Sequence, residues 1–366
     1  MKTIFGTVLL MLVARPGLGQ FLEPGFDKKE YAELLKINQK VHLGQEKWPG
    51  DTALPLPERY EFVFRAPALA FDNCWDLWVH RDKRQAVIAV RGTVETQASF
   101  MANFYAAMVP AKGSLELEKG VKFDYALSEN PHAAVHVGWL VSMAYLSKSI
   151  GHKLDSCYKA GIKDFILTGH SQGGGITFLL TSYLNSLKKQ QKLPGDMRFK
   201  TYCSAAPKPG NLFFAYDYEA ATAGGWAFNV VNPADWVPDV PFSLQTVDDF
   251  TQTNPFSGAK AMIRKQKFPR NMALRHVYRK LSRPSKKAQK NYERYLGRMV
   301  AKGVKKQLPG FTLPEYYHSN YYVRTGTTIV LSPDEEYFRI YPHETGKIWK
   351  HHFPQNYLYL LESYQH

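Results

Sequence analysis

The sequence has few cysteines and no long hydrophobic run. Its 366 residues include three cysteines, Cys74, Cys157 and Cys203, whose wide spacing matches no metal-binding motif. One disulfide among them fits the sequence, and so do three small buried thiols. The lack of any run of about 18 apolar residues excludes a membrane-spanning helix. With 45% apolar residues the chain is not disordered, and its length predicts one large α/β domain or two ordinary ones.

Acidic residues are almost absent from one region of the chain. Between Lys260 and Lys306 there are 17 Lys or Arg residues and a single acid, Glu293. The rest of the chain holds 30 basic and 31 acidic residues, although the whole protein carries a formal charge of +15. The sequence therefore predicts a near-neutral globule with one strongly basic insertion, at about 253–306.

The first 19 residues are typical of a secretory signal peptide. Lys2 supplies a short positive region, and a mostly apolar stretch runs from Thr3 to Ala14. The small residues Gly17 and Gly19 precede a predicted cleavage site ahead of Gln20. We therefore expect a secreted or periplasmic protein that begins at Gln20. A short first helix of the fold is the alternative interpretation.

Stretches typical of strands alternate with stretches typical of helices, which predicts a mostly parallel sheet covered by helices. The predicted helices are 140–150 and 173–189, and the basic insertion is predicted to form two helical halves that meet at Pro284. Because the insertion interrupts the alternation without starting a new pattern, residues 20–366 are predicted to form one domain. The predicted strands are 61–65, 73–80, 86–90, 134–137, 164–167, 198–204, 227–231, 322–331 and 337–341.

The strongest chemical signal lies in residues 164–175. A buried strand leads directly into Gly169-His-Ser-Gln-Gly173, a G-x-S-x-G motif, and an apolar helix follows at once. Such a sharp turn from strand to helix places Ser171 in a strained conformation with its Oγ exposed above the sheet. Glycines are needed there because a Cβ would collide with the neighbouring strand or helix. Ser171 is therefore the predicted nucleophile.

A serine nucleophile also needs an orienting acid and a base, which follow it along the chain in this architecture. Asp235 comes directly after the apolar stretch 228–231 and is favoured over Asp239, which is typical of a turn. Composition does not select the base. The candidate histidines outside the insertion are His318, His343, His351, His352 and His366.

Several sequence blocks, taken in order, resemble the class 3, or fungal-type, lipases. The likeness extends from about residue 86 to residue 361. The turn around Ser171, residues 168–174, is here called the elbow; it fits the family pattern closely, with Gln172 where Leu is more usual. The resemblance implies an α/β-hydrolase fold. The basic helical insertion, which interrupts the likeness, is expected between the acid and the histidine. The blocks are Arg91-Gly-Thr93, Val135-His-Val-Gly-Trp139, Thr168–Gly174, Ala206-Pro-Lys-Pro-Gly-Asn211 and Asn232–Pro238.

The resemblance also implies the remaining site residues. Class 3 enzymes carry their catalytic histidine near the C-terminus in a segment similar to H-x-x-x-x-Y-L. That pattern fits His352 and leaves the adjacent His351 as the alternative, whereas His318 resembles an earlier, non-catalytic block. By the same resemblance, the backbone N–H groups of Thr93 and Gln172 form the oxyanion hole.

The implied activity is hydrolysis of lipid carboxylic esters of the acylglycerol type, through a Ser-His-Asp triad and an acyl-enzyme intermediate. Hydrolysis of phospholipids or other esters is an alternative, as is a non-catalytic protein that binds lipids or polyanions on the same scaffold. We expect no cofactor and no metal. The sequence has no phosphate-binding loop, and His343-Glu344 lacks the second histidine of an H-E-x-x-H motif.

The basic insertion has three interpretations. It is a solvated helix pair on the surface, or a lid or interfacial element whose apolar stripe contacts the acyl site or a lipid surface. In the second case its cations attract anionic headgroups. Nucleic acid is the third and least favoured partner, because no module that reads bases accompanies the charge.

Overall fold

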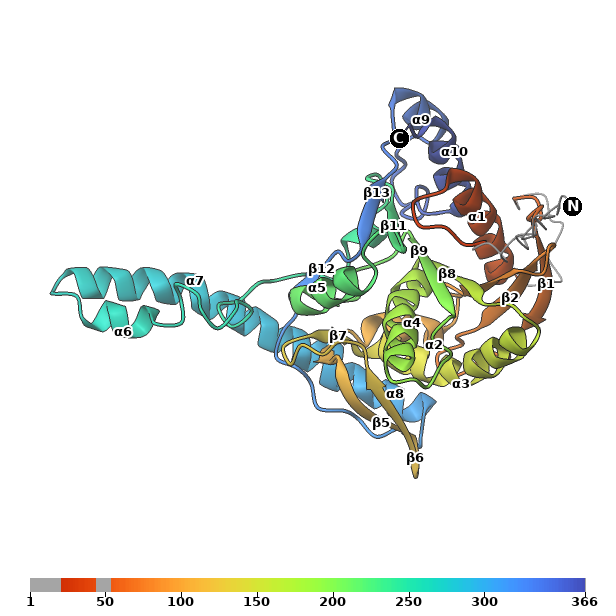
Figure 1. The fold of residues 1–366 in the computed structure, drawn as a ribbon. Helices are drawn as coiled ribbons and strands as arrows, with labels where there is room; N and C mark the ends of the chain where they lie inside the picture. Colours follow the sequence, from red (N-terminus) through yellow and green to blue (C-terminus); the bar gives the residue numbers. More distant parts are fainter. Residues whose placement is uncertain (1–20, 44–53, 366) are drawn as a thin grey trace, which may run out of the picture.

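A central sheet of seven strands organises the protein (Figure 1). The computed structural model describes residues 21–43 and 54–365. The sheet order is β1-β2-β3-β8-β9-β11-β13; the strands from β3 to β13 are parallel, and β1 and β2 pair antiparallel at one edge. The predicted mostly parallel sheet is thus confirmed. The strands are β1 Tyr60–Arg65, β2 Trp75–His80, β3 Gln85–Val90, β8 Asp164–His170, β9 Arg198–Ser204, β11 Ala227–Val231 and β13 Thr327–Val330.

Helices cover both faces of this sheet (Figure 1). Because side chains alternate along a strand, β3 directs Ala86, Ile88 and Val90 toward α3 and α4, and Val87 and Ala89 toward α1 and α10. Both faces are therefore apolar and buried, as parallel strands require. The helices are α1 Lys28–Leu43, α3 Val137–Lys159, α4 Gln172–Lys189 and α10 Pro354–Ser363.

A second sheet of four short strands, in the order β12-β10-β7-β4, lies beside the first. The predicted single strand over 322–331 is divided between the two sheets, with β12 in the small sheet and β13 in the central one. Gly326 separates them with a φ of 85°, a conformation that glycine adopts without strain. The strands are β4 Met108–Pro110, β7 Ala134–His136, β10 Gly210–Asn211 and β12 Tyr322–Val323.

The predicted strand at 337–341 is wrong, because the segment forms the helix α9, Glu335–Ile340. Asp334 caps this helix by accepting a hydrogen bond from Tyr337 N, and Glu335 and Glu336 occupy its first turn. Carboxylates stabilise a helix N-terminus because they satisfy free N–H groups and oppose the helix dipole. The capping signal outweighs the apolar pattern here.

The basic segment does not divide at Pro284. Helix α7, Arg270–Tyr292, continues through this proline, although a proline inside a helix lacks the N–H of one backbone hydrogen bond. Beside it, the hydroxyl groups of Ser282 and Ser285 donate to the carbonyl oxygens of Tyr278 and Ser282. The helical geometry changes later, at the π-helical segment η3, Glu293–Met299. The remaining helices are α6 Ala259–Arg264 and α8 Val300–Gln307.

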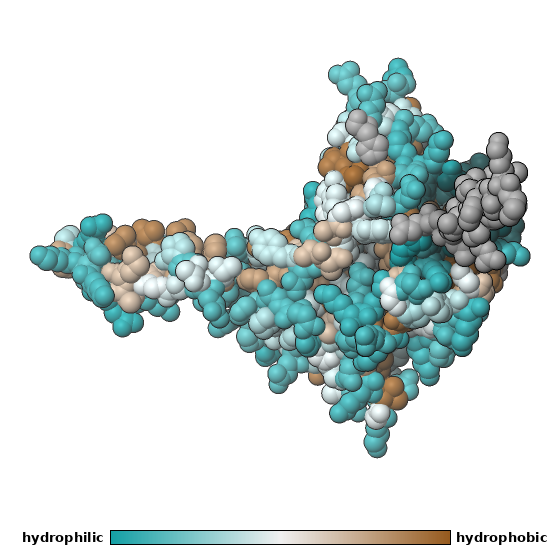
Figure 2. All heavy atoms as spheres, in the orientation of Figure 1, coloured by the Kyte–Doolittle hydropathy of each residue, from teal (hydrophilic) through white to brown (hydrophobic). Residues whose placement is uncertain are grey.

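The two ends of this basic segment differ in their surroundings. Helices α6 and α7, here called the basic arm (residues 259–292), project from the body (Figure 1), and Figure 2 shows hydrophobic residues along one edge of the arm. In contrast, η3 and α8 pack on the body, where Leu296 O accepts hydrogen bonds from Ala106 N and Ala107 N. Helix α8 also contacts α2, Gln97–Phe104.

The three cysteines are each buried and free. Within the described ranges, no helix combines the length and the apolar character needed to cross a membrane. The predicted signal peptide, residues 1–19, lies outside the described residues. One domain over residues 20–366 also stays a prediction.

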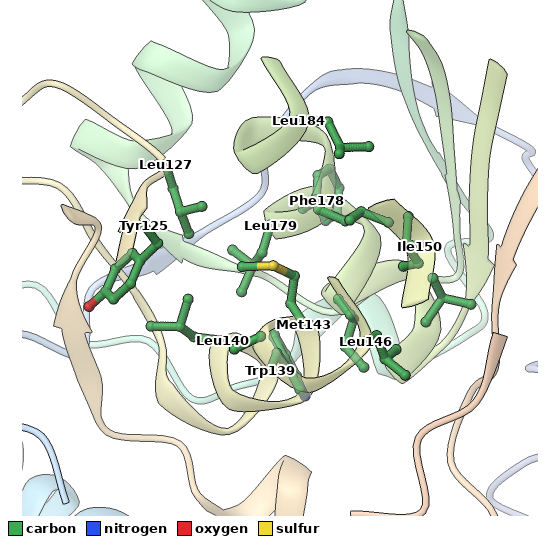
Figure 3. Packing of buried hydrophobic residues seen from close by; sticks show 14 of the residues in the cluster. Tyr125, Leu127, Trp139, Leu140, Met143, Leu146, Ile150, Phe178, Leu179 and Leu184 are labelled. Carbon is green, nitrogen blue, oxygen red and sulfur yellow. The ribbon is translucent and has the colours of Figure 1, made fainter. Parts of the chain in front are cut away.

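A large apolar core holds α4 in place. Figure 3 shows Met143 and Leu146 of α3 lying against Phe178 and Leu179 of α4, with Tyr125 from a neighbouring hairpin beside them. The hairpin strands are β5 Lys112–Glu118 and β6 Val121–Ala126. Each such side chain contributes about 1.5–3 kcal/mol when fully buried. The packing fixes α4, whose first residue directly follows Ser171.

His136 joins the start of α3 to the α2 region. Its Nδ1 accepts a hydrogen bond from Trp139 N, its Nε2 donates to the carbonyl oxygen of Asn103, and its ring stacks on Trp139 with centroids 3.7 Å apart. Burial lowers the pKa of His136 to about 3. The imidazole is therefore neutral in the folded protein at pH values where it is already charged in the unfolded chain.

This neutral histidine predicts acid destabilisation. The folded pKa lies below the unfolded one, so the stability is intact above about pH 6.5 and falls by about 1.4 kcal/mol per pH unit below it. In the variant His136→Asn, a capping acceptor remains but the titration is lost. We expect its free energy of unfolding, measured by urea denaturation between about pH 6 and pH 4, to fall less steeply by about that slope. Exposed His152→Asn on α3 is the control, and equal slopes in both variants would contradict the prediction.

Candidate active site

Ser171 lies at the turn between β8 and α4. Its φ of 62° and ψ of −133° fall outside the regions that residues with a side chain normally adopt. Its N–H donates to Ser204 O at 2.9 Å, and its carbonyl oxygen accepts from Gly174 N and Gly175 N. The side chain forms no capping bond to α4. The backbone is thus held on both sides, and Oγ is left available for chemistry.

Close backbone contacts around the turn depend on glycine. A Cβ on Gly169 would lie 2.3 Å from the carbonyl carbon of Gly173, and one on Gly173 would lie 2.2 Å from Val90 O. A Cβ on Gly92 would lie 2.9 Å from His170 O. No side chain fits at these distances. The glycines therefore allow the end of β3 to lie directly against the elbow.

Asp235 and His352 are in direct contact. Asp235 follows β11, and its side chain is fully buried. Its Oδ2 accepts hydrogen bonds from His352 Nδ1 at 2.7 Å and Tyr357 OH at 2.8 Å, and its Oδ1 accepts from Val237 N at 3.0 Å. With its Nδ1 proton donated to the carboxylate, the imidazole presents an unprotonated Nε2, the tautomer that a general base needs.

The alternatives named from the sequence have other partners. His351 forms hydrogen bonds with Tyr337 OH at 2.9 Å and with His343 Nδ1 at 3.2 Å. Burial, together with the neighbouring His343, lowers the pKa of His351. Asp239 is largely exposed and lies 4.0 Å from the guanidinium of Arg324. Neither alternative takes part in the carboxylate–imidazole contact.

His170 links the elbow to the loop that carries His352. Its Nε2 donates to His352 O at 2.6 Å, so its Nδ1 accepts from Ser204 Oγ at 3.0 Å. Tyr31 OH lies 2.6 Å from the same Ser204 Oγ and donates to it. Burial and the nearby His352 hold the pKa of His170 well below its usual value. A neutral imidazole therefore bridges the two halves of the site.

Ser171 and His352 are neighbours through this bridge. The rings of His170 and His352 have centroids 4.8 Å apart, and His170 directly precedes Ser171. Over residues 21–43 and 54–365, no hydrogen bond joins Ser171 Oγ to His352 Nε2. In many enzymes this bond is long before the substrate binds and shortens in the complex.

The two predicted oxyanion residues share one side-chain network. Gln172 is the first residue of α4, so its N–H has no carbonyl partner within the helix. Its side-chain Nε2 donates to Ser99 O at 3.0 Å and to Asn103 Oδ1 at 2.8 Å. Asn103 Nδ2 in turn donates to Thr93 Oγ1 at 3.0 Å. The Asn103 amide thus connects the elbow to the segment after β3.

Two tryptophans border His352. The ring of Trp349 lies 5.5 Å from that of His352, and the ring of Trp236 lies 5.0 Å from that of Trp349, measured between centroids. Both tryptophans are more than one third exposed. They give this side of the site a partly exposed apolar surface. Among the described residues, no cluster of three or more His, Cys, Asp or Glu side chains could hold a metal ion.

Three residues of the site, His170, Tyr357 and Asn103, were not predicted from the sequence. Tyr357 is the tyrosine of the H-x-x-x-x-Y-L segment and His170 is the histidine of the elbow, so both stood in motifs that the sequence displayed. Asn103 had no such signal. Its partners Thr93 and Gln172 are 10 and 69 positions away, and the fold alone brings them together.

The chain is similar to several solved fungal lipase structures. For the Rhizomucor miehei lipase propeptide complex the identity is 19%, the match covers 60% of this chain and 65% of that one, just under two thirds, and the TM-score is 0.41. For lipase II from Rhizopus niveus the identity is 20%, the match covers 58% of this chain and 74% of that one, and the TM-score is 0.43. For Lip2 lipase from Yarrowia lipolytica the identity is 20%, the match covers 60% of this chain and 77% of that one, and the TM-score is 0.43.

No curated protein matches the chain in sequence. The family model described as Lipase (class 3) matches residues 87–245. This segment includes most of β3, the Arg91–Thr93 block, the elbow with Ser171, and Asp235 with its loop. His352 lies beyond it. The match covers less than half of the chain, and it shows that this segment is similar to the class 3 lipase family.

Proposed function

We propose that this protein is a serine ester hydrolase that cleaves lipid carboxylic esters of the acylglycerol type through Ser171, His352 and Asp235. The observation that carries the proposal is the 2.7 Å contact between His352 Nδ1 and Asp235 Oδ2. This contact lies beside the strained turn of Ser171, and His170 links the two through its hydrogen bond to His352 O. The match of residues 87–245 to the class 3 lipase family model supports a carboxylic ester as the substrate.

In this mechanism His352 Nε2 accepts the Ser171 proton while Oγ attacks the ester carbonyl. Asp235 stabilises the imidazolium that forms, and that imidazolium then protonates the departing alcohol. A water molecule, deprotonated by the same His352, hydrolyses the acyl-enzyme and releases the fatty acid. The buried carboxylate keeps the imidazole in one tautomer and one orientation throughout.

The tetrahedral oxyanion needs donors that are aimed before the reaction starts. We assign this role to the N–H groups of Gln172 and Thr93, whose side chains are both held by Asn103. Thr93 Oγ1 accepts the bond from Asn103, so its own proton is available as a third donor. Loss of one such donor typically costs about 3 kcal/mol of transition-state stabilisation.

The surroundings of the triad favour an apolar ester. Trp236 and Trp349 offer partly exposed rings beside His352, where an acyl chain would pack. A phospholipid ester is the second candidate substrate. The observation that favours it is that the segment from Lys260 to Lys306 holds 17 basic residues and one acid. This positive charge would attract anionic headgroups.

We also propose that residues 253–306 are an insertion in the family fold and that the basic arm contacts anionic lipid surfaces. Leu274, Val277 and Leu281 form an apolar stripe on α7 and are 38%, 53% and 74% exposed. Cations surround the stripe, and hydrophobic residues line the edge of the arm in Figure 2. An amphipathic helix of this kind lies in a membrane interface with its apolar face inserted.

We also propose that the protein is exported. The pattern of residues 1–19 supports a signal peptide that is cleaved before Gln20, which would place the enzyme outside the cytoplasm. Lipid esters and lipid surfaces are the substrates and partners expected there.

Replacing the nucleophile tests the activity. Ser171→Ala should lower kcat/KM for p-nitrophenyl butyrate by at least about 10⁴-fold, because no other group can form the acyl-enzyme. The variant should also lose labelling by a fluorophosphonate, which reacts only with an activated serine. Ser114→Ala, at an exposed position of strand β5, is the control. Wild-type hydrolysis by purified Ser171→Ala would contradict the assignment.

Paired substitutions test the acid and the base. Asp235→Asn should lower kcat by about 10⁴-fold, because the amide favours the wrong imidazole tautomer. Asp239→Asn is the matched control and should retain most of the activity. His352→Gln should be as damaging as Asp235→Asn, whereas His351→Gln should lose far less. Steady-state kinetics on the four proteins measures this, and the reverse ranking within either pair would refute the roles.

The apolar stripe of the arm is tested by vesicle sedimentation. The triple variant Leu274→Ser, Val277→Ser and Leu281→Ser should bind anionic vesicles at least about tenfold more weakly, because apolar area no longer enters the bilayer.

A control variant with three substitutions on the body distinguishes loss of the stripe from a general loss of surface hydrophobicity. Leu56, Val63 and Val121 are 52%, 53% and 50% exposed, and their replacement by serine should leave vesicle binding unchanged. If the arm variant sediments with vesicles as well as the wild type does, the stripe does not contact lipid.

A further inference from the structure

A basic cleft of about 470 Å³ lies between α6 and α7 of the arm. Its volume is in the range typical of sites for small molecules. None of the described residues that line it is acidic. A concave surface with charge of one sign concentrates the electrostatic field and attracts counter-ions. Six cations line the cleft: Lys260, Arg264, Arg275, Arg279, Arg283 and Lys286.

Most of this charge is not neutralised by the protein. Lys286 is paired with Asp248, whereas the other five cations have no ion-pair partner in the part of the chain that the structure describes. Arg275, Arg279 and Arg283 follow one another at four-residue spacing along α7. Like charges at this spacing repel and destabilise a helix. An anion that enters the cleft would relieve this repulsion.

The kind of cation indicates the kind of anion. Four of the six lining cations are arginines. The planar guanidinium donates two parallel hydrogen bonds to a phosphate group, which gives geometric selectivity that an ammonium lacks. A phosphomonoester presents three terminal oxygens and close to two charges, so it satisfies several arginines at once. A phosphodiester presents fewer free oxygens and a single charge.

The rest of the arm indicates where this phosphate comes from. Met262, Phe268 and Met272 are exposed on and beside α6 and the start of α7, next to the stripe of Leu274 and Val277. A soluble phosphate would not require exposed apolar side chains, whereas a bilayer accommodates both the cations and the apolar residues.

We propose that the cleft between α6 and α7 binds the phosphomonoester headgroup of an anionic lipid while the apolar stripe of α7 lies in the bilayer. The inference rests on the lipid-surface contact proposed above and adds selectivity for one headgroup. It assigns the arm a specific ligand rather than a diffuse attraction to negative charge.

Vesicle binding at matched surface charge tests the cleft. All proteins are full-length and carry Ser171→Ala, so binding is measured without hydrolysis and independently of the proposed activity. Phosphatidylcholine vesicles contain either phosphatidic acid or phosphatidylserine, adjusted to equal zeta potential. The protein with an intact arm should bind the phosphatidic acid vesicles about tenfold more tightly, because only that headgroup satisfies several arginines.

Two triple substitutions of equal charge locate the effect. Arg275→Gln, Arg279→Gln and Arg283→Gln should abolish the preference for phosphatidic acid. Arg270→Gln, Lys280→Gln and Lys287→Gln remove the same charge from α7 outside the cleft and should weaken binding to both vesicles while the preference remains. Far-UV circular dichroism and the thermal midpoint confirm that the variants are folded.

Three outcomes would overturn the proposal. One is the absence of a preference in the protein with the intact arm, and the second is an equal loss of preference in both triples, which would mean diffuse attraction. The third is binding of inositol hexakisphosphate or of a DNA duplex without binding to vesicles, which would identify a soluble polyanion as the ligand. Competition by inositol hexakisphosphate for vesicle-bound protein, lost only in the cleft triple, supports the site.

Discussion

The buried carboxylate of Asp235 is the constraint on which the site depends. A charge with no exposure to water is costly unless hydrogen bonds replace its hydration. Asp235 receives three, from Val237 N, His352 Nδ1 and Tyr357 OH. Two of these donors come from the C-terminal segment, more than one hundred residues later in the chain. The carboxylate therefore requires that segment to close on β11, and this closure places the imidazole.

Around this buried carboxylate, neutral polar groups fix the geometry of the site. His170 joins the backbone of His352 to Ser204, and burial keeps it uncharged. Asn103 joins the side chains of Thr93 and Gln172. Fully bonded networks of this kind specify one arrangement because each unpaired group would be costly. The basic arm differs, because most of its cations are exposed and have no ion-pair partner among residues 21–43 and 54–365.

The sequence predicted the parts of the fold that depend on neighbouring residues. Strands such as 86–90 and 198–204 were placed within one residue, because alternating or continuous apolar residues are a local signal. The predictions failed where a few residues decide between competing structures. The strand expected at 337–341 is a helix that Asp334 caps, and α7 continues through Pro284.

The turn at Ser171 was determined by the sequence itself, because its strand, its glycines and its helix lie within a few positions of one another. The basic character of the arm was equally a matter of composition. The sequence pattern favoured His352 and left His351 as the alternative. Tertiary structure decided which of the two contacts Asp235, because the side chains of adjacent loop residues point in different directions. It also decided the place of Asn103, because contacts between distant segments depend on how the whole chain packs.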